Sequence, residues 1–133
     1  MRKSILLLAA FVISAVSLTA NANASRNQQF IEQMGDVVAY GQAVGKHCTI
    51  TKYDEDIRIT AQILGEAADM LRNKILDSQV IPYQIRVDFE AYRQRLVKSM
   101  DRLAGSEKFD SACREGFEHH LTKIGNALAV FEK

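Results

Sequence analysis

The sequence predicts an all-α fold, an antiparallel up-down-up-down bundle of four helices closed by one disulfide between Cys48 and Cys113. Two observations lead to this fold class. Apolar residues recur at intervals of three and four in four separate segments, which is typical of amphipathic helices. The β alternative is weak because Val80 and Ile81 form the one β-like run, and it is too short for a strand.

The four apolar stripes define the expected helices. They run over residues 30–48, 57–75, 85–103 and 109–131. Short connections between consecutive helices favour an antiparallel arrangement of neighbours. With one proline and no low-complexity tract, the segment 25–133 is expected to form a single helical domain.

Capping signals support these boundaries. Ser25 begins a capping-box pattern, and residues 51–54 offer several side-chain acceptors before the second helix. Pro82 suits the first turn of the third helix. For the fourth helix, both Ser106 and Asp110 are candidate N-caps.

The first 24 residues are typical of a cleaved signal peptide. Arg2 and Lys3 precede an apolar run from residue 5 to 16, and small residues end at Ala24. The run is shorter than the roughly 20 apolar residues of a membrane span, which makes an uncleaved anchor the less favoured alternative. We therefore expect cleavage after Ala24 and a periplasmic or secreted protein that begins at Ser25.

The charge of the expected mature chain argues against two classes of partner. Cleavage would remove two of the 17 basic residues and none of the 16 acidic ones, so 15 basic residues would remain. Nucleic acids and anionic membranes are usually bound through an excess of positive charge. We expect neither as a partner, and no stable membrane insertion after cleavage.

The two cysteines constrain the topology. Cys48 lies at the end of the first expected helix and Cys113 near the start of the fourth. In an up-down-up-down bundle both positions fall at the same end, within the ~5.5 Å Cα separation that a disulfide needs. A structural bridge is favoured over a redox-active pair, because export favours oxidation and no CxxC spacing is present.

His120 is the most distinctive candidate residue. Helical phase places it on the apolar face of the last helix and turns His119 toward solvent. Its depth matches that of Tyr40 and Thr60 on the first two helices. Two interpretations remain: a core histidine bonded to Tyr40 or Thr60, or a residue that binds a small ligand or metal.

Haem, copper and zinc are the ligands that His120 suggests. No CxxCH motif is present for covalent attachment of haem. For a non-covalent haem, Met34 is the candidate for a second axial ligand beside His120, but it lies at a different depth along the bundle. His47 and His119 form no metal-ligand spacing, and a disulfide removes both sulfurs. We therefore expect no cofactor, and we keep the carrier of a small ligand or metal as the alternative function.

No catalytic motif is present in the sequence. It contains no GxSxG, P-loop or GxGxxG pattern, and the acidic residues 54–56 suit the positive end of a helix dipole. We expect the protein not to be an enzyme.

Surface features favour binding to another protein. Arg95, Lys98 and Arg102 share one face of the third helix and are a candidate interface. Gly41 and Gly45 are four residues apart, which favours close helix approach, within the core or between subunits, or else local flexibility. The sequence thus predicts a non-catalytic exported helical protein that binds another envelope or secreted protein, as immunity proteins, chaperones and secretion accessory factors do. The sequence also leaves open that the protein forms a homodimer.

Overall fold

The computed structural model describes residues 15–131, with side chains from residue 24 onward. The chain divides into two units, residues 1–30 and 31–133. Of the first unit, residues 15–30 are described, and they are helical. Most of the predicted signal peptide lies outside the described residues, and cleavage after Ala24 stays a prediction.

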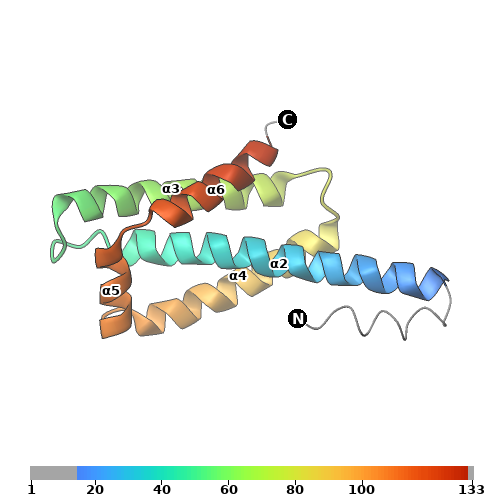
Figure 1. The fold of residues 1–133 in the computed structure, drawn as a ribbon, viewed down its shortest axis with the longest axis horizontal. Coiled ribbons are helices and arrows are strands. Elements are labelled where there is room, and N and C mark those ends of the chain that lie inside the picture. Colours follow the sequence, from blue (N-terminus) through green and yellow to red (C-terminus); the bar gives the residue numbers. More distant parts are fainter. Residues whose placement is uncertain (1–14, 132–133) are drawn as a thin grey trace. The chain divides into compact units, whose positions relative to one another are not determined.

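The fold is all-α, as the sequence predicts. In the described part of the chain there are five helices and no strands. The helices, labelled in Figure 1, are α2 (Ala15–His47), α3 (Glu55–Asp77), α4 (Tyr83–Leu103), α5 (Glu107–Glu115) and α6 (Glu118–Val130).

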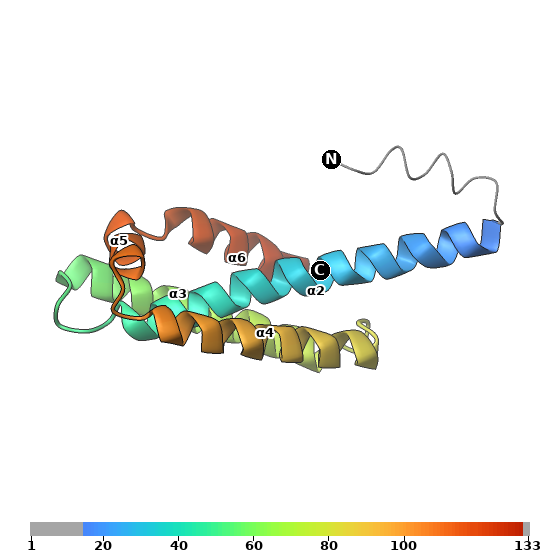
Figure 2. The same cartoon turned by 90° about the horizontal axis from the view of Figure 1, so that it is seen from below.

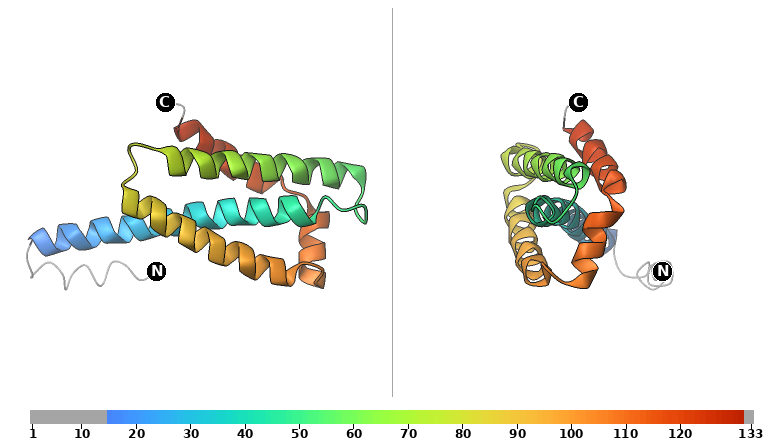
Figure 3. Two further views of the ribbon diagram at one scale, coloured as in Figure 1. Left: turned by 180° about the vertical axis from the view of Figure 1, so that it is seen from behind. Right: turned by 90° about the vertical axis from the view of Figure 1, so that its left-hand side faces the viewer.

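Within the unit of residues 31–133, consecutive long helices run in opposite directions. Figures 1 and 2 show α3 returning alongside the last part of α2, α4 turning back again, and α6 running opposite to α4. The end-on view in Figure 3 shows the last part of α2 in the middle, with α3, α4 and α6 around it. The up-down-up-down order is therefore present, with α5 as a short connecting helix at one end.

The expected fourth helix is in fact two helices. Gly116 has φ of +93°, a conformation that L side chains rarely adopt, and it separates α5 from α6. The apolar spacing across residues 109–131 did not reveal this break, because glycine also occurs within helices. Ser106 is the N-cap of α5, and its hydroxyl accepts a hydrogen bond from the backbone N–H of Phe109.

Three other predicted boundaries differ in detail. Residue Ser25 does not begin a helix in the described chain, because α2 starts at Ala15 and continues through it. Asp54 occupies the N-cap position of α3 without a side-chain capping bond. Pro82 precedes α4 at its N-cap position rather than lying in the first turn.

The core lies between the inward faces of α2, α3, α4 and α6. Its fully buried large side chains are Val38, Val44, Leu64, Leu71, Ile75, Phe89, Phe117 and Ile124. The glycines on α2 contribute close packing. A Cβ atom added at Gly41 would lie 2.7 Å from the Cβ of Ala68, so α2 and α3 approach each other through small residues. This places the Gly41 and Gly45 contact within the core.

The disulfide between Cys48 and Cys113 is confirmed. Their Cα atoms lie 5.6 Å apart, and both residues are fully buried. The bond joins the end of α2 to α5, at the end of the bundle where the antiparallel order brings them together. A buried disulfide is typical of proteins from non-reducing compartments. Among the described helices, none has both the length and the apolar character required to cross a membrane.

Candidate functional site

The connection between α3 and α4 is held rigidly by side chains. The Ser78 hydroxyl accepts hydrogen bonds from the backbone N–H groups of Val80 and Ile81, each at 3.1 Å. The Arg86 guanidinium donates to the carbonyl oxygens of Leu76 and Ile81, at 2.9 and 3.1 Å. These bonds satisfy backbone groups that would otherwise need water, so the loop has a defined conformation.

This loop and the first two turns of α4 present apolar side chains to solvent. Val80 is 90% exposed and Tyr83 is 71% exposed, while Val87 continues the patch along α4 at 40%. The Arg86 guanidinium lies 5.6 Å from the centre of the Tyr83 ring and helps to orient it. An exposed tyrosine held in place resembles the anchors of protein interfaces, where loss of conformational entropy on binding is small, and Val80 adds exposed apolar area.

Basic residues continue the same face of α4. At about 100° per residue, Val87, Lys98 and Arg102 lie within about 60° of one another, opposite the buried Phe89. Arg95 flanks them, and all three basic residues are exposed, as the sequence predicts. The guanidinium of Arg95 lies 5.8 Å from the Tyr92 ring centre. We call Val80, Tyr83, Val87, Arg95, Lys98 and Arg102 the α4 surface.

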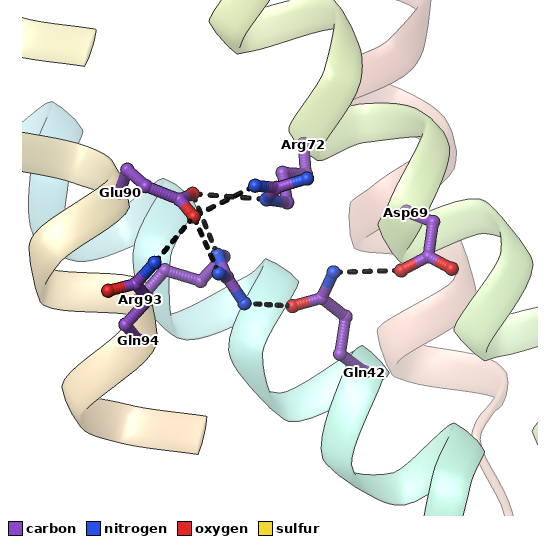
Figure 4. Close-up of polar contacts among 6 residues, drawn as sticks. All are labelled: Gln42, Asp69, Arg72, Glu90, Arg93 and Gln94. Carbon is purple, nitrogen blue, oxygen red and sulfur yellow. Dashed lines mark hydrogen bonds and ion pairs between the residues drawn. The ribbon is translucent and has the colours of Figure 1, made fainter. Parts of the chain in front are cut away.

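A clamped carboxylate fixes the inward side of α4 to the rest of the bundle. Glu90 receives paired hydrogen bonds from Arg72 of α3, at 3.0 and 2.8 Å, and from Arg93 of α4, at 2.9 and 2.7 Å (Figure 4). Partial burial opposes ionisation of Glu90, but these arginine hydrogen bonds outweigh it and lower its pKa to about 2.

The same network reaches α2. Arg93 donates to the amide oxygen of Gln42 at 2.7 Å, and the amide nitrogen of Gln42 donates to Asp69 of α3 at 2.8 Å (Figure 4). Three helices are therefore joined by one chain of polar contacts, which sets the rotation of α4 about its axis. Sequence reasoning missed this network. The i,i+3 spacing of Glu90 and Arg93 is a local signal for their pairing, whereas Arg72 is 18 residues from Glu90 on another helix and has none.

A second polar cluster lies near the disulfide. Asp110 of α5 accepts hydrogen bonds from the Tyr53 hydroxyl at 2.8 Å and from the Arg114 guanidinium at 3.0 Å, and Lys52 lies 2.9 Å away. These three partners hold the pKa of Asp110 well below its usual range. Nearby, His47 Nε2 lies 2.8 Å from Asp101 Oδ1, which ties the end of α2 to α4. The Asp110 cluster fastens α5 to the connection between α2 and α3, and the His47–Asp101 contact joins α2 to α4.

The His120 side chain is partly buried rather than enclosed. The ring of Tyr40 lies 4.0 Å from it, centre to centre, so α2 and α6 meet at this pair. Burial lowers the pKa of His120, and the nearby His119 and Lys123 lower it further. The Thr60 hydroxyl does not donate to His120, because it donates to the backbone carbonyl of Asp56 at 2.7 Å.

An open cavity of about 570 Å³ lies beside His120. It is lined by Thr60 and by residues 115–121, including Glu115, Glu118 and His119. Among the described residues, no three histidine, cysteine or carboxylate side chains are arranged to hold a metal ion. Met34 lines a different groove, with Asn126 and Ala127, at another level of the bundle from His120.

Comparisons with known proteins contribute no functional information. A scan of protein families and searches of curated proteins and of solved structures found no match to this chain. The functional interpretation therefore depends on the surfaces and side-chain clusters described above.

Proposed function

We propose that this chain is a non-catalytic, exported protein of the periplasm or the secreted fraction that binds another protein through the α4 surface. The observation that carries the proposal is the exposure of Val80, on a loop braced by Ser78 and Arg86, and of Tyr83, at the start of α4 directly after that loop. Folding does not need these side chains at the surface, whereas an interface does.

The charge of the α4 surface indicates the chemistry of the partner. Within the described part of the chain, no salt bridge engages Lys98 or Arg102. Unpaired cations beside an apolar patch suit a partner that offers apolar side chains followed by carboxylates. The cations would speed association and fix orientation, while burial of Val80 and Tyr83 would supply most of the affinity.

Export supports this role without identifying the partner. The basic and apolar residues of the first 24 positions are typical of a signal peptide, and the buried disulfide suits an oxidising compartment. Immunity, chaperone and secretion-accessory roles all fit a small helical domain with such a surface, and they differ in the partner alone.

Site-specific photo-crosslinking in the producing cell tests the proposal. A photoreactive residue at position 80 should form a specific adduct with another envelope or secreted protein. The same residue at exposed Thr122 on α6 is the matched control and should not form it. The purified partner should then bind the protein, and Tyr83→Asp should weaken binding by roughly tenfold or more.

Two outcomes contradict the proposal. The first is an identical adduct pattern at positions 80 and 122, since a specific surface would distinguish them. The second is a stoichiometric metal, haem or small ligand in the purified protein that disappears in His120→Gln, which supports the carrier function instead.

Charge reversal by Lys98→Glu with Arg102→Glu should slow association with the partner and reduce the dependence of the association rate on salt.

A further inference from the structure

The outer face of α3 carries apolar side chains that the bundle does not cover. Ile59 and Ile63 are each 50% exposed and Met70 is 52% exposed. At about 100° per residue, they lie within about 60° of one another together with Glu66, opposite the buried Leu64 and Leu71. We call Ile59, Ile63, Glu66 and Met70 the α3 stripe.

The spacing of the α3 stripe is symmetric about its own midpoint. Its residues follow one another at intervals of four, three and four, with the midpoint between Leu64 and Gly65. Two copies of α3 packed antiparallel across a two-fold axis through this midpoint would bring Ile59 opposite Met70 and Ile63 opposite Glu66. A surface that matches itself in this way is what an isologous dimer requires.

The charges beside the α3 stripe favour the same antiparallel orientation. Glu55 and Asp56 lie at its amino-terminal end and Lys74 at its carboxy-terminal end, all exposed. The two-fold axis that pairs Ile59 with Met70 also places Glu55 opposite Lys74 of the second copy, twice per dimer. A parallel arrangement would instead set acid against acid and lysine against lysine, which is unfavourable.

Glu66 is compatible with this contact because of where its carboxylate lies. Gln62, one turn earlier on α3, donates a hydrogen bond to Glu66 Oε2 at 3.3 Å. The charged end is thereby drawn to the flank of the helix, and the methylene groups of Glu66 remain in the stripe. The carboxylate still limits affinity, because it must stay hydrated beside the apolar contact.

From these features we infer that the protein forms an antiparallel homodimer through the α3 stripe. This surface is separate from the α4 surface, so the inference does not rest on the proposed function. The contact belongs to the small, transient class, and we expect a dissociation constant of about 10 to 100 μM.

Sedimentation velocity over a concentration series tests the inference on the oxidised protein purified from the producing cell. The unmodified protein should shift from monomer to dimer with increasing concentration. Ile63→Glu should raise the dissociation constant by roughly tenfold or more, because it places a charge in the contact. Thr122→Glu adds the same charge on exposed α6 and should leave the constant unchanged.

Two further variants test the symmetry and the orientation. Glu66→Leu completes the apolar stripe and should lower the dissociation constant by roughly tenfold. Lys74→Glu should weaken the dimer a few-fold at low salt, and adding Glu55→Lys should restore it, because the pairing across the axis is then reversed at both ends. Circular dichroism identifies the variants that remain folded and can be compared.

The inference is overturned if the unmodified protein is monomeric up to about 1 mM, the weak end of measurable association. It is equally overturned if Ile63→Glu and Thr122→Glu have the same effect. If the double charge variant dimerises no better than Lys74→Glu, the antiparallel orientation is wrong.

Discussion

Gly45 of α2 faces Gly65 of α3 so closely that a Cβ atom added to Gly45 would lie 2.5 Å from the Cα atom of Gly65. A Cβ atom essentially never approaches an atom of another residue this closely, so a larger residue at position 45 would push the two backbones apart. The contact explains why two glycines with poor helix propensity lie within these helices. The contact also fixes the position of α3 along the axis of α2.

The first prediction compares two glycine substitutions. Gly45→Ala should lower the free energy of unfolding by about 1 to 2 kcal/mol, because forced separation of the helices outweighs the gain in helix propensity. Gly125→Ala is the control, since nothing lies within 4 Å of its added Cβ. It should stabilise the protein by up to about 1 kcal/mol in urea unfolding. Equal effects of the two substitutions would contradict close packing at Gly45.

The second prediction concerns the carboxylate clamped by Arg72 and Arg93. The folded pKa of Glu90 is about 2, below its ordinary value of 4.5. Its stabilisation is therefore fully present above pH 4.5 and is lost as the pH falls toward 2. Near neutral pH, Glu90→Gln should cost roughly 1 to 2 kcal/mol after allowance for solvent screening, and this difference should shrink in acid.

Urea unfolding of both proteins at several pH values from 6 down to 2 measures this loss. The matched control is Asp88→Asn on the exposed side of α4, where Gln84 is the hydrogen-bonding neighbour. Its effect should stay within about 0.5 kcal/mol. A pH-independent cost of Glu90→Gln would show that the arginines do not act through its charge.

The third prediction concerns His120 beside Tyr40. Because burial lowers the folded pKa of His120 below 6.5, the unfolded state takes up its proton first as the pH falls. The protein should therefore lose stability between pH 7 and 5, and His120→Gln should lose less over the same interval. Thermal unfolding measures this difference, with His119→Gln as the exposed control, and an NMR titration should place the His120 pKa below 6.5.

A pKa of His120 above 6.5 would contradict this prediction. If His120 titrates above 6.5, the imidazolium has a stabilising partner that the packing against Tyr40 does not supply. The protein would then become more stable in acid, which reverses the predicted sign.

The fourth prediction concerns the disulfide. Replacing both cysteines with alanine should lower the free energy of unfolding by about 4 kcal/mol on the loop-entropy model, because the bond closes a loop with a sequence separation of 65. Reductant should act slowly on the folded protein, since Cys48 and Cys113 are fully buried. The reduced protein and the double variant should share one urea midpoint. A double variant as stable as the unmodified protein would show that packing alone holds α5 against α2.

Most of the helices, their antiparallel order and the disulfide could be predicted from the residues alone. Apolar spacing is a local property of the sequence and can be read without knowledge of the fold. The segments around Leu64, Phe89 and Ile124 were therefore recognisable as helical. The cysteine positions then required antiparallel order, because a disulfide joins only Cα atoms that lie close together.

The candidate surfaces were predicted less completely. Helical phase identified the exposed side of Arg95, Lys98 and Arg102, but the exposure of Val80 and Tyr83 depends on bonds from Ser78 and Arg86 that no spacing reveals. The bracing of the loop, which is a matter of three-dimensional contacts, keeps them in solvent.

The sequence by itself determined the helical class, the single bridge between Cys48 and Cys113 and the order of the long helices, because periodicity and chain connectivity are encoded locally. The tertiary structure decided where the last helix breaks at Gly116, which arginines hold Glu90, and which apolar side chains of α3 and α4 remain uncovered. These features depend on how each helix is rotated and shifted against its neighbours. That placement results from packing and hydrogen bonding between residues distant in the chain, such as Gly45 with Gly65 and Arg72 with Glu90.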